Sequence, residues 1–296
     1  MRCAGIVTYN PDLERLRANL NNTASQVDAV FVFDNGSENV ADIRSLADSE
    51  YTTLRVEADP NNRGIAFALN RLLDAAKEHG FKHMLLLDQD SVPTEGMCDE
   101  LERHLTGSVA LVCPFILDRN RMTEEEWQAQ KMPPERLTHA AKHGAITSGS
   151  LVDVAAALEV GGFDDNLFID YVDFDFNERL ILNGYEIVKD NTVYLLHEKG
   201  KSERTWLKVP RNTSAGVQWQ PLYKLGYSPM RCYYQSRNRI VYWKKYHRHT
   251  GGEGLTEIPL LMALSLLFEN HRIAKLRAYS RGIHDGMKMK IVEYRK

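Results

Sequence analysis

Two carboxylates, Asp88 and Asp90, follow directly after a short apolar run, and this spacing suggests chemistry. Residues 84–87, Met-Leu-Leu-Leu, are typical of a strand that is buried on both faces. In an open parallel sheet, ligands bind just outside the carboxyl ends of the strands, where both acids would lie. Two hard oxygen ligands suit Mg²⁺ or Mn²⁺, which hold a substrate diphosphate with one or two protein carboxylates. An ordinary solvated turn is the alternative.

A second group of acids is a candidate for proton transfer. Asp170, Asp173 and Asp175 occur within six residues and are interleaved with aromatic side chains. A helix start accommodates acids, because they cap free N–H groups and complement the helix dipole. That explanation accounts for one aspartate more easily than for three. The aromatic neighbours would partly desolvate a carboxylate, and the pKa of a desolvated carboxylate can be shifted. The segment therefore predicts a general base.

His197 follows the apolar run 193–196. A single histidine at a strand end is either structural or a metal ligand. Both interpretations stay open, and the ligand interpretation gains from the carboxylates that precede His197 in the chain.

Polar residues also end the other predicted strands. Thr8, Tyr9 and Asn10 follow one apolar run, and Asp34 follows another. The carboxyl ends of parallel strands share one edge, so these side chains predict a single ligand cleft. Turn chemistry explains part of the pattern, because Asn, Asp and Gly favour turns in any protein.

The elements that must position these residues alternate regularly between strand and helix. Strands are predicted at 4–9, 29–33, 52–56, 84–87 and 109–115, and helices at 13–20, 61–79 and 96–105. Such alternation predicts an α/β fold with a doubly wound, mainly parallel sheet flanked by helices. Beyond it we expect a long loop at 117–143, a helix at 151–159, and two short strands at 186–190 and 193–196.

Charge divides the chain into two regions. Residues 1–199 carry 18 Lys and Arg against 34 Asp and Glu, whereas residues 200–296 carry 19 against 6. We therefore expect an acidic domain at 1–200, which fits a metal site, and a basic helical region at 201–296. The four cysteines have no metal-like or disulfide-like spacing, and neither a secretory signal nor a membrane span is evident. A cytoplasmic protein is expected.

The basic region suggests anionic partners. Arg231 and Arg237, in a helix predicted from residue 229, have the guanidinium fork that suits diphosphate oxygens. Residues 257–278 combine an apolar face with basic residues. That segment either packs on the domain or lies on the inner membrane surface, among anionic headgroups. No nucleic-acid partner is expected.

Several motifs together resemble the inverting glycosyltransferases of family 2, which have the GT-A fold. They occur in the family's order and comprise 5–10 (Gly-Ile-Val-Thr-Tyr-Asn), 34–37 (Asp-Asn-Gly-Ser), 62–64 with Asn70, 88–90, 148–150, 161–164, 171–175 with Arg179, and His197. Residues 88–91, 168–173 and 228–238 are similar to the rhamnosyltransferase branch, which uses dTDP-L-rhamnose. Many members have Glu-Asp where this chain has Val172-Asp173, so the resemblance implies that Asp173 is the base.

The resemblance also implies roles for the remaining residues. A divalent ion, Mg²⁺ or Mn²⁺, would bind Asp88, Asp90 and His197. Asp173 would deprotonate a hydroxyl of a saccharide or lipid-linked saccharide acceptor, in the synthesis of a cell-surface polysaccharide. The acceptor side would include Gly149, Asp170, Tyr171 and Asp175. The donor would contact Thr8, Tyr9, Asn10, Asp34, Asn62, Arg63, Gly64, Asp88, Gln89, Asp90, Arg231 and Arg237.

Other functions fit parts of the pattern. A glycosyltransferase that uses another UDP- or dTDP-sugar would share most of these contacts. A haloacid-dehalogenase-type phosphatase also has an Asp-x-Asp motif, but on the first strand of its sheet, whereas three strands precede Asp88 here. A sugar nucleotidylyltransferase needs a glycine-rich basic loop after the first strand, and residues 8–11 are not one. A non-catalytic sugar- or lipid-binding module would tolerate loss of Asp173.

Overall fold

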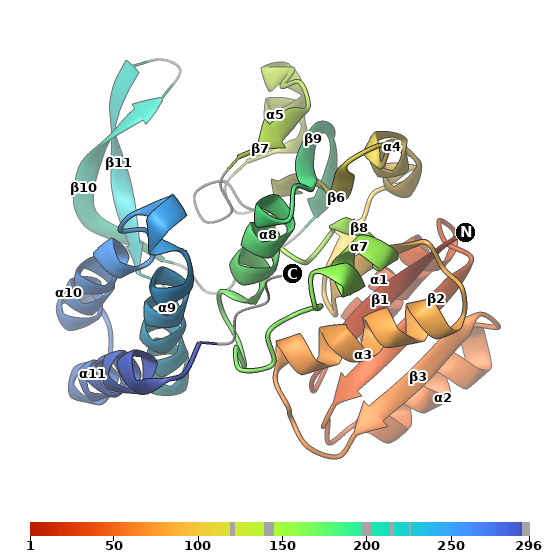
Figure 1. Ribbon diagram of the computed structural model, residues 1–296, viewed down its shortest axis with the longest axis horizontal. Helices are drawn as coiled ribbons and strands as arrows, with labels where there is room; N and C mark the ends of the chain where they lie inside the picture. Colours follow the sequence, from red (N-terminus) through yellow and green to blue (C-terminus); the bar gives the residue numbers. More distant parts are fainter. Residues whose placement is uncertain (119–121, 139–144, 197–202, 214–215, 225, 292–296) are drawn as a thin grey trace. The chain divides into compact units, whose positions relative to one another are not determined.

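A computed structural model of the chain describes residues 1–118, 122–138, 145–196, 203–213, 216–224 and 226–291 (Figure 1). The chain divides into two units, Met1–Glu198 and Lys199–Glu293, close to the change in charge at residue 200. His197, a predicted metal ligand, lies outside the described residues.

The first unit alternates strands and helices as the sequence predicts. Its elements, in chain order, are β1 (Arg2–Thr8), α1 (Leu13–Ala24), β2 (Ala29–Asn35), α2 (Val40–Glu50), β3 (Leu54–Asp59), α3 (Ile65–Glu78), β4 (His83–Asp88), β5 (Val92–Pro93), α4 (Met97–His104), β6 (Val109–Leu117), α5 (Glu124–Gln130), β7 (Glu135–Leu137), β8 (Leu151–Asp153), α7 (Val154–Glu159), α8 (Val172–Leu182) and β9 (Glu186–Leu196).

The described strands of this unit form a nine-stranded sheet in the order β3-β2-β1-β4-β8-β6-β9-β5, with β7 paired to β9. Neighbouring strands from β3 to β4 are parallel, as are β6 and β9. The chain order reverses direction at β1, so right-handed crossovers place α1 and α2 on one face and α3 on the other (Figure 1). The predicted doubly wound, mainly parallel sheet is confirmed.

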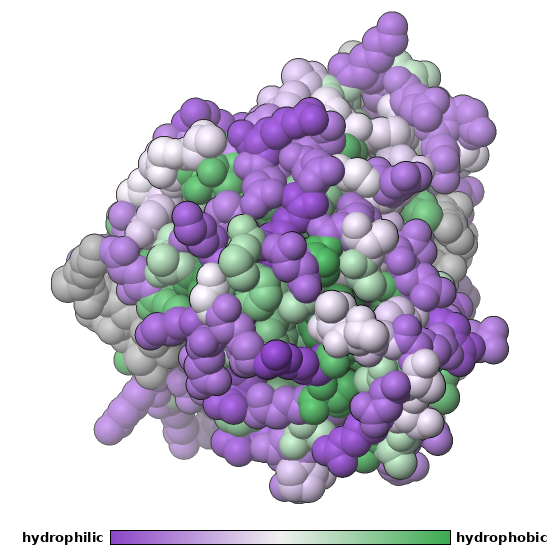
Figure 2. All heavy atoms as spheres, turned by 90° about the vertical axis from the view of Figure 1, so that its right-hand side faces the viewer, coloured by the Kyte–Doolittle hydropathy of each residue, from purple (hydrophilic) through white to green (hydrophobic). Residues whose placement is uncertain are grey.

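The core explains why the apolar runs form strands. β1, β2 and β4 are buried along nearly their whole length, and α1 and α2 pack apolar residues against one face of the sheet. Because the strands are covered on both faces, their sequences are continuously apolar and do not alternate. On the outside, the side of the molecule in Figure 2 is mostly hydrophilic, with apolar side chains appearing between charged ones. None of the described helices is both long and apolar enough to cross a bilayer.

Three local expectations differ from the structure. The predicted helix 151–159 begins with strand β8, which pairs antiparallel with β4 and β6, and the helix starts only after Asp153. The two short strands predicted at 186–196 form the single strand β9, whose register against β6 shifts after Pro114. The predicted loop 117–143 contains α5 and β7 within its described part.

The second unit consists of a β-hairpin and helices. Its elements are β10 (Glu203–Thr213), β11 (Gly216–Lys224), α9 (Pro229–Thr250), a 3₁₀ turn (Leu255–Glu257), α10 (Ile258–Phe268) and α11 (Arg272–Lys288). The antiparallel hairpin occupies the polar stretch that precedes the helices of this region, and the sequence did not predict it. α9 begins with Pro229 at its first position, and the Ser228 side chain accepts a hydrogen bond from the amide of Arg231, which is a favoured helix start.

Two glycines let α9 and α11 approach closely. A Cβ atom on Gly282 would overlap the carbonyl oxygen of Tyr233, and one on Gly286 would lie 2.7 Å from that of Arg237. Gly282 and Gly286 are one helical turn apart, so they form one flat strip on α11. The main chains of the two helices therefore pack directly against each other.

We expect Gly282→Ala to lower the free energy of unfolding by about 2 kcal/mol, because the added methyl group forces the two helices apart. Urea denaturation measures the change. The exposed Ser280 on the same helix gives a matched control, since Ser280→Ala adds no buried atom and should change stability little. Equal stability of the two variants would contradict the close packing.

Candidate functional site

The carboxyl ends of four neighbouring parallel strands bring the predicted polar residues to one edge of the sheet. Thr8 ends β1 and pairs with Asp34 of β2 in register, while Asp88 ends β4 beside Val7. This is the edge where open α/β sheets bind ligands. The predicted grouping of Thr8, Asp34 and Asp88 is therefore present in the structure.

Asp34 is the centre of a buried hydrogen-bond network. Its carboxylate accepts hydrogen bonds from the Thr8 hydroxyl (2.9 Å), from the Ser37 amide (2.8 Å) and from the Ser37 hydroxyl. The amide of Asn10 donates in turn to the Ser37 hydroxyl (2.7 Å). An ionised carboxylate has about four acceptor positions. The Thr8 and Ser37 bonds occupy three of them, which leaves roughly one for a ligand. The network holds the turns after β1 and β2 in a fixed relation.

The loop before α3 is fixed to the same edge. The Asn35 side chain accepts from the amide of Arg63 (2.8 Å) and donates to the carbonyl oxygen of Gly64 (3.1 Å). The Asn62 side chain accepts from the amide of Gly64 (3.0 Å), and the Arg63 guanidinium lies 4.1 Å from the centre of the Phe67 ring. The residues predicted to close on a nucleotide thus form an ordered loop.

Gly64 brings this loop against a distant segment of the chain. The amide of Ile65 donates to the carbonyl oxygen of Phe168 (2.8 Å), and a Cβ atom on Gly64 would lie 2.7 Å from that oxygen. Gly64 also has a φ of 90°, which L side chains rarely adopt. Only glycine fits this position, and it places residues 62–64 next to the turn that leads to Asp173.

Polar groups on three sides position the strand end at Asp88. Its amide donates to the Ser148 hydroxyl (3.1 Å), and its carbonyl oxygen accepts from the Asn19 side chain (2.8 Å). The Ser91 and Ser148 hydroxyls share a hydrogen bond of 2.7 Å. Because these bonds hold the main chain of Asp88, they fix the position from which its side chain extends. Asp88 and Asp90 are both partly exposed.

Gln89, between the two aspartates, links this strand end to the first one. Its side-chain oxygen accepts a hydrogen bond from the amide of Tyr9 (2.8 Å). Tyr9 itself is 48% exposed. Gln89 therefore supports the Tyr9 turn, and the Tyr9 ring is available to a ligand.

An unusual turn presents Asp173. Asp170 and Tyr171 have φ values of 65° and 67°, two successive left-handed residues without glycine. Such conformations persist where the surrounding structure enforces them, and they are frequent at functional sites. α8 begins immediately after this turn, so Asp173 lies in its first turn, where the carboxylate accepts from the amide of Phe174 (2.9 Å).

Burial and neighbouring acids raise the pKa of Asp173 to about 7. Burial is the largest cause, and the negative charges of Asp170 and Asp88 add to it. The contact between Gly64 and Phe168 brings the turn before Asp173 to the loop at the carboxyl edge of the sheet, and Asp88 at that edge is the smallest of the causes. A carboxyl group with a pKa near neutrality can accept a proton from a hydroxyl at physiological pH.

The donor set fits a hard divalent cation. Asp170 and Asp88 each add negative charge to the surroundings of Asp173, and a cation would offset it. Among the described residues, no group of three or more His, Cys, Asp or Glu side chains makes a complete metal site. Mg²⁺ commonly uses one or two carboxylates and takes its other ligands from water and substrate phosphates. Asp88 and Asp90 are residues of the required kind.

Other predicted site residues lie elsewhere or have other contacts. Asp175 is fully buried and forms an ion pair with Arg179 (3.0 Å), so this geometry does not favour contact with an acceptor. Gly149 faces Pro114 and Leu195, and its amide bonds to Leu86 in β4. Tyr171 is buried and contacts Phe174.

The two predicted diphosphate contacts of the basic region lie on α9, in the second unit. The Arg231 guanidinium is 4.4 Å from the centre of the Tyr227 ring, and that of Arg237 is 4.7 Å from the Tyr234 ring. Their predicted contact with a diphosphate stays a prediction.

Sequence reasoning gave no role to Asn19. It is fully buried on α1, and its side chain donates to the carbonyl oxygen of Asp88 and accepts from Thr23. A signal exists in the sequence: Leu16, Asn19, Leu20 and Thr23 have the spacing of one buried helix face, and a polar residue there needs a partner.

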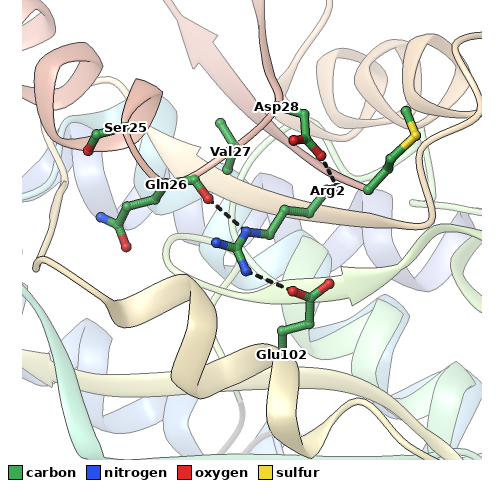
Figure 3. A pocket seen from close by; sticks show the side chains of 7 residues that line it. Arg2, Ser25, Gln26, Val27, Asp28 and Glu102 are labelled. Atoms are coloured by element: carbon green, nitrogen blue, oxygen red, sulfur yellow. Dashed lines mark hydrogen bonds and ion pairs between the residues drawn. The ribbon is translucent and has the colours of Figure 1, made fainter.

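A pocket of about 350 Å³ lies at the opposite, amino-terminal ends of the strands (Figure 3). The Arg2 side chain extends into it and donates to the carbonyl oxygen of Gln26 and to Glu102, both at 2.7 Å. Arg2 also pairs with Asp99, so its charge is met by two acids. These contacts fix the start of β1 against α4, and the pocket is a structural feature at the edge away from the site.

Comparison with known proteins agrees with this geometry. A family model described as glycosyl transferase family 2 matches residues 3–157. Over 270 residues the chain is 27% identical to the dTDP-rhamnosyl transferase RfbF of Shigella flexneri, a match that covers 88% of this chain and 82% of that protein.

Solved structures share the fold at low sequence identity. The mannosyltransferase PcManGT from Pyrobaculum calidifontis, in complex with GDP-Man and Mn²⁺, has a TM-score of 0.56 and 15% identity over 98% of this chain and 76% of its own. GalNAc-T7 with UDP, GalNAc and Mn²⁺ has a TM-score of 0.55 and 14% identity, over 97% of this chain but only 56% of its own. TarS of S. aureus in complex with UDP-GlcNAc has a TM-score of 0.54 and 14% identity, and the match covers 97% of this chain and 80% of TarS 1–349. The predicted GT-A fold is confirmed.

The pKa of Asp173 predicts a pH-dependent stability difference. Between the ordinary value of 3.8 and the folded value of about 7, the folded protein keeps a proton that the unfolded chain has released. The free energy of unfolding therefore falls as pH rises through this window. Asp173→Asn lacks this effect, so we expect its stability relative to wild type to rise by roughly 2–4 kcal/mol from pH 4 to pH 8.

Urea denaturation at a series of pH values, in the presence of a metal chelator, measures this difference. Asp48, exposed on α2, offers a matched control, and Asp48→Asn should follow the wild-type pH trend. Parallel curves for Asp173→Asn and wild type would show that the Asp173 carboxyl titrates normally.

Proposed function

The chain belongs to glycosyltransferase family 2, and from this premise we propose that it transfers L-rhamnose from dTDP-L-rhamnose, with inversion, to a hydroxyl of a saccharide or lipid-linked saccharide acceptor. Synthesis of a cell-surface polysaccharide is the proposed setting. The 27% identity to a dTDP-rhamnosyl transferase over most of both chains supports this donor. The observation that carries the proposal is that Asp88 ends β4 at the ligand-binding edge of the sheet, while the hydrogen bond from Ile65 to Phe168 joins the turn before Asp173 to the loop at the same edge.

The nucleotide would lie across the ends of β1 and β2. Asp34, with about one acceptor position left, would receive the N–H of a pyrimidine base. The exposed Tyr9 ring provides a surface for the base or ribose. The loop 62–64, fixed by Asn35, would close the nucleotide side, and the Arg63 guanidinium would contact a phosphate or the base.

A divalent cation, Mg²⁺ or Mn²⁺, would be held by Asp88 and Asp90 together with the donor diphosphate. When bound, it stabilises the negative charge that develops on the departing nucleoside diphosphate. The crowding of carboxylates around Asp173 supports this assignment, because their mutual repulsion favours a bound cation.

Asp173 would act as the general base. The acceptor hydroxyl oxygen attacks the anomeric carbon and forms the new C–O bond, while the bond from that carbon to the diphosphate oxygen breaks. The hydroxyl proton moves to the Asp173 carboxylate, and the bonding electrons leave with the nucleoside diphosphate. Asp170 raises the pKa of the Asp173 carboxyl and would orient the acceptor.

We expect Asp173→Asn to lower kcat for sugar transfer by roughly 10²–10⁴-fold, because positioned proton transfer contributes a factor of this size. Affinity for the nucleoside diphosphate should stay close to wild type, since Asp173 is not a donor ligand in this mechanism. Asp48→Asn, on the exposed face of α2, serves as the control and should keep full activity. Near-normal transfer by Asp173→Asn would remove the base assignment.

A thermal-shift panel of nucleotide-sugars, with and without Mn²⁺, tests donor and metal together. We expect dTDP-L-rhamnose to raise the Tm more than UDP-sugars do, and to do so more strongly with Mn²⁺, because binding to the folded state stabilises it. Asp90→Ala should lose the metal-dependent part of the shift. A larger response to a UDP-sugar would reassign the donor, and an undiminished response of Asp90→Ala would refute its role in metal binding.

A further inference from the structure

Helix α10 has an exposed face without any polar side chain. The exposed residues within it are spaced one, three, three and one apart, which places them on one side of a helix: Pro259, Leu260, Ala263, Leu266 and Leu267. Leu260 and Leu267 are 50% and 61% exposed. The buried residues Ile258, Leu264 and Ser265 lie on the other side and pack within the second unit.

The β-hairpin of the same unit adds tryptophans to this surface. The Trp206 ring is 80% exposed, and its centre lies 5.7 Å from that of Phe268 at the end of α10. Trp219, also exposed, stands opposite Pro210 in the hairpin register. Along β10, exposure alternates residue by residue from Arg204 to Pro210, so one face of the hairpin is turned to solvent.

Cationic side chains accompany the apolar ones. Arg204 and Lys208 are exposed at alternate positions on either side of Trp206, and Lys208 stands opposite Pro221, two residues from Trp219. Arg272, the first residue of α11 and four positions beyond the end of α10, is exposed, as is its neighbour Ile273. Residues 200–296 carry 19 Lys and Arg against 6 Asp and Glu, so the surroundings are strongly positive.

We propose that the exposed face of α10 and the Trp206–Trp219 face of the hairpin bind an anionic membrane surface. Apolar area combined with basic charge determines the affinity of such interfacial elements, and tryptophan is favoured at the level of the headgroups. α10, with 11 residues, is roughly 16 Å long and would lie along the bilayer surface without crossing it. The sugar transfer proposed above does not require this surface, so the inference goes beyond it.

Two other occupants fit the surface less well. A second copy of the chain would bring two strongly positive regions together, and like charges at an interface weaken association. A saccharide would stack on Trp206 or Trp219 but would find no hydrogen-bonding partner on the leucines of α10. Anionic lipid matches both the charge and the apolar face.

Co-sedimentation of the full chain with vesicles tests the proposal. We expect binding to vesicles of phosphatidylcholine with phosphatidylglycerol, much weaker binding to phosphatidylcholine alone, and weakening by added salt. Leu267→Glu should reduce binding at least about tenfold, because it replaces a membrane-buried side chain with a charge. Leu182→Glu, at a leucine of α8 that is 44% exposed in the first unit, is the matched control and should bind like wild type.

Each outcome decides between the occupants. Equal binding by Leu267→Glu and Leu182→Glu, or no binding to anionic vesicles, would overturn the proposal. A dimer without lipid that Leu267→Glu dissociates would assign the surface to a second copy instead. The Tm shift caused by the nucleotide-sugar, measured on the same variants, reports on the donor site separately. If no nucleotide-sugar raises the Tm, the proposed function fails, but vesicle binding still tests the membrane surface.

Discussion

Burial of the Asp173 carboxyl is the constraint on which the candidate site depends, because it is the largest cause of the raised pKa of that group. The negative charges of Asp170 and Asp88 add to the effect of burial. What holds them is a set of main-chain attachments. Ser148 and Asn19 fix the backbone of Asp88, and a strained left-handed turn fixes Asp170. The stability lost by burying this carboxyl leaves it with a pKa near neutrality, which is the property that the proposed general base requires.

Much of the fold could be predicted because it depends on local patterns. β1, β2 and β4 are buried on both faces, so they are continuous apolar runs, and each ends where a polar residue reaches the ligand edge. β8 could not be predicted, because its three residues become a strand only through pairing with β4 and β6. The β10–β11 hairpin was missed for a similar reason, since Arg204, Trp206 and Lys208 place polar and aromatic residues together on one exposed face.

The acidic residues of the candidate site could be proposed from the sequence, but the residues that hold them in place, such as Asn19, could not. Asp88 was evident from the apolar run before it, whereas Asp173 was one of three candidate acids among aromatic residues and was selected by the resemblance to family 2. Asp175 resembled them in sequence, yet its position on α8 turns it into the interior against Arg179. Two residues along a helix correspond to a rotation of more than half a turn, so neighbours in a motif face different environments. Asn19 lies far from Asp88 in the chain, and no local pattern joins them.

The junction between Gly64 and Phe168 consists of main-chain atoms, with the amide of Ile65 bonded to the Phe168 carbonyl oxygen. The Asn62 and Asn35 side chains bond the main chain of Gly64 and belong to the same junction. Loop 62–64 and the turn before Asp173 are therefore aligned through peptide atoms and two asparagines, and other side chains of the two segments can vary without changing that alignment. Directed evolution of the proposed donor preference would keep Asn35, Asn62 and Gly64 and would vary the residues around them.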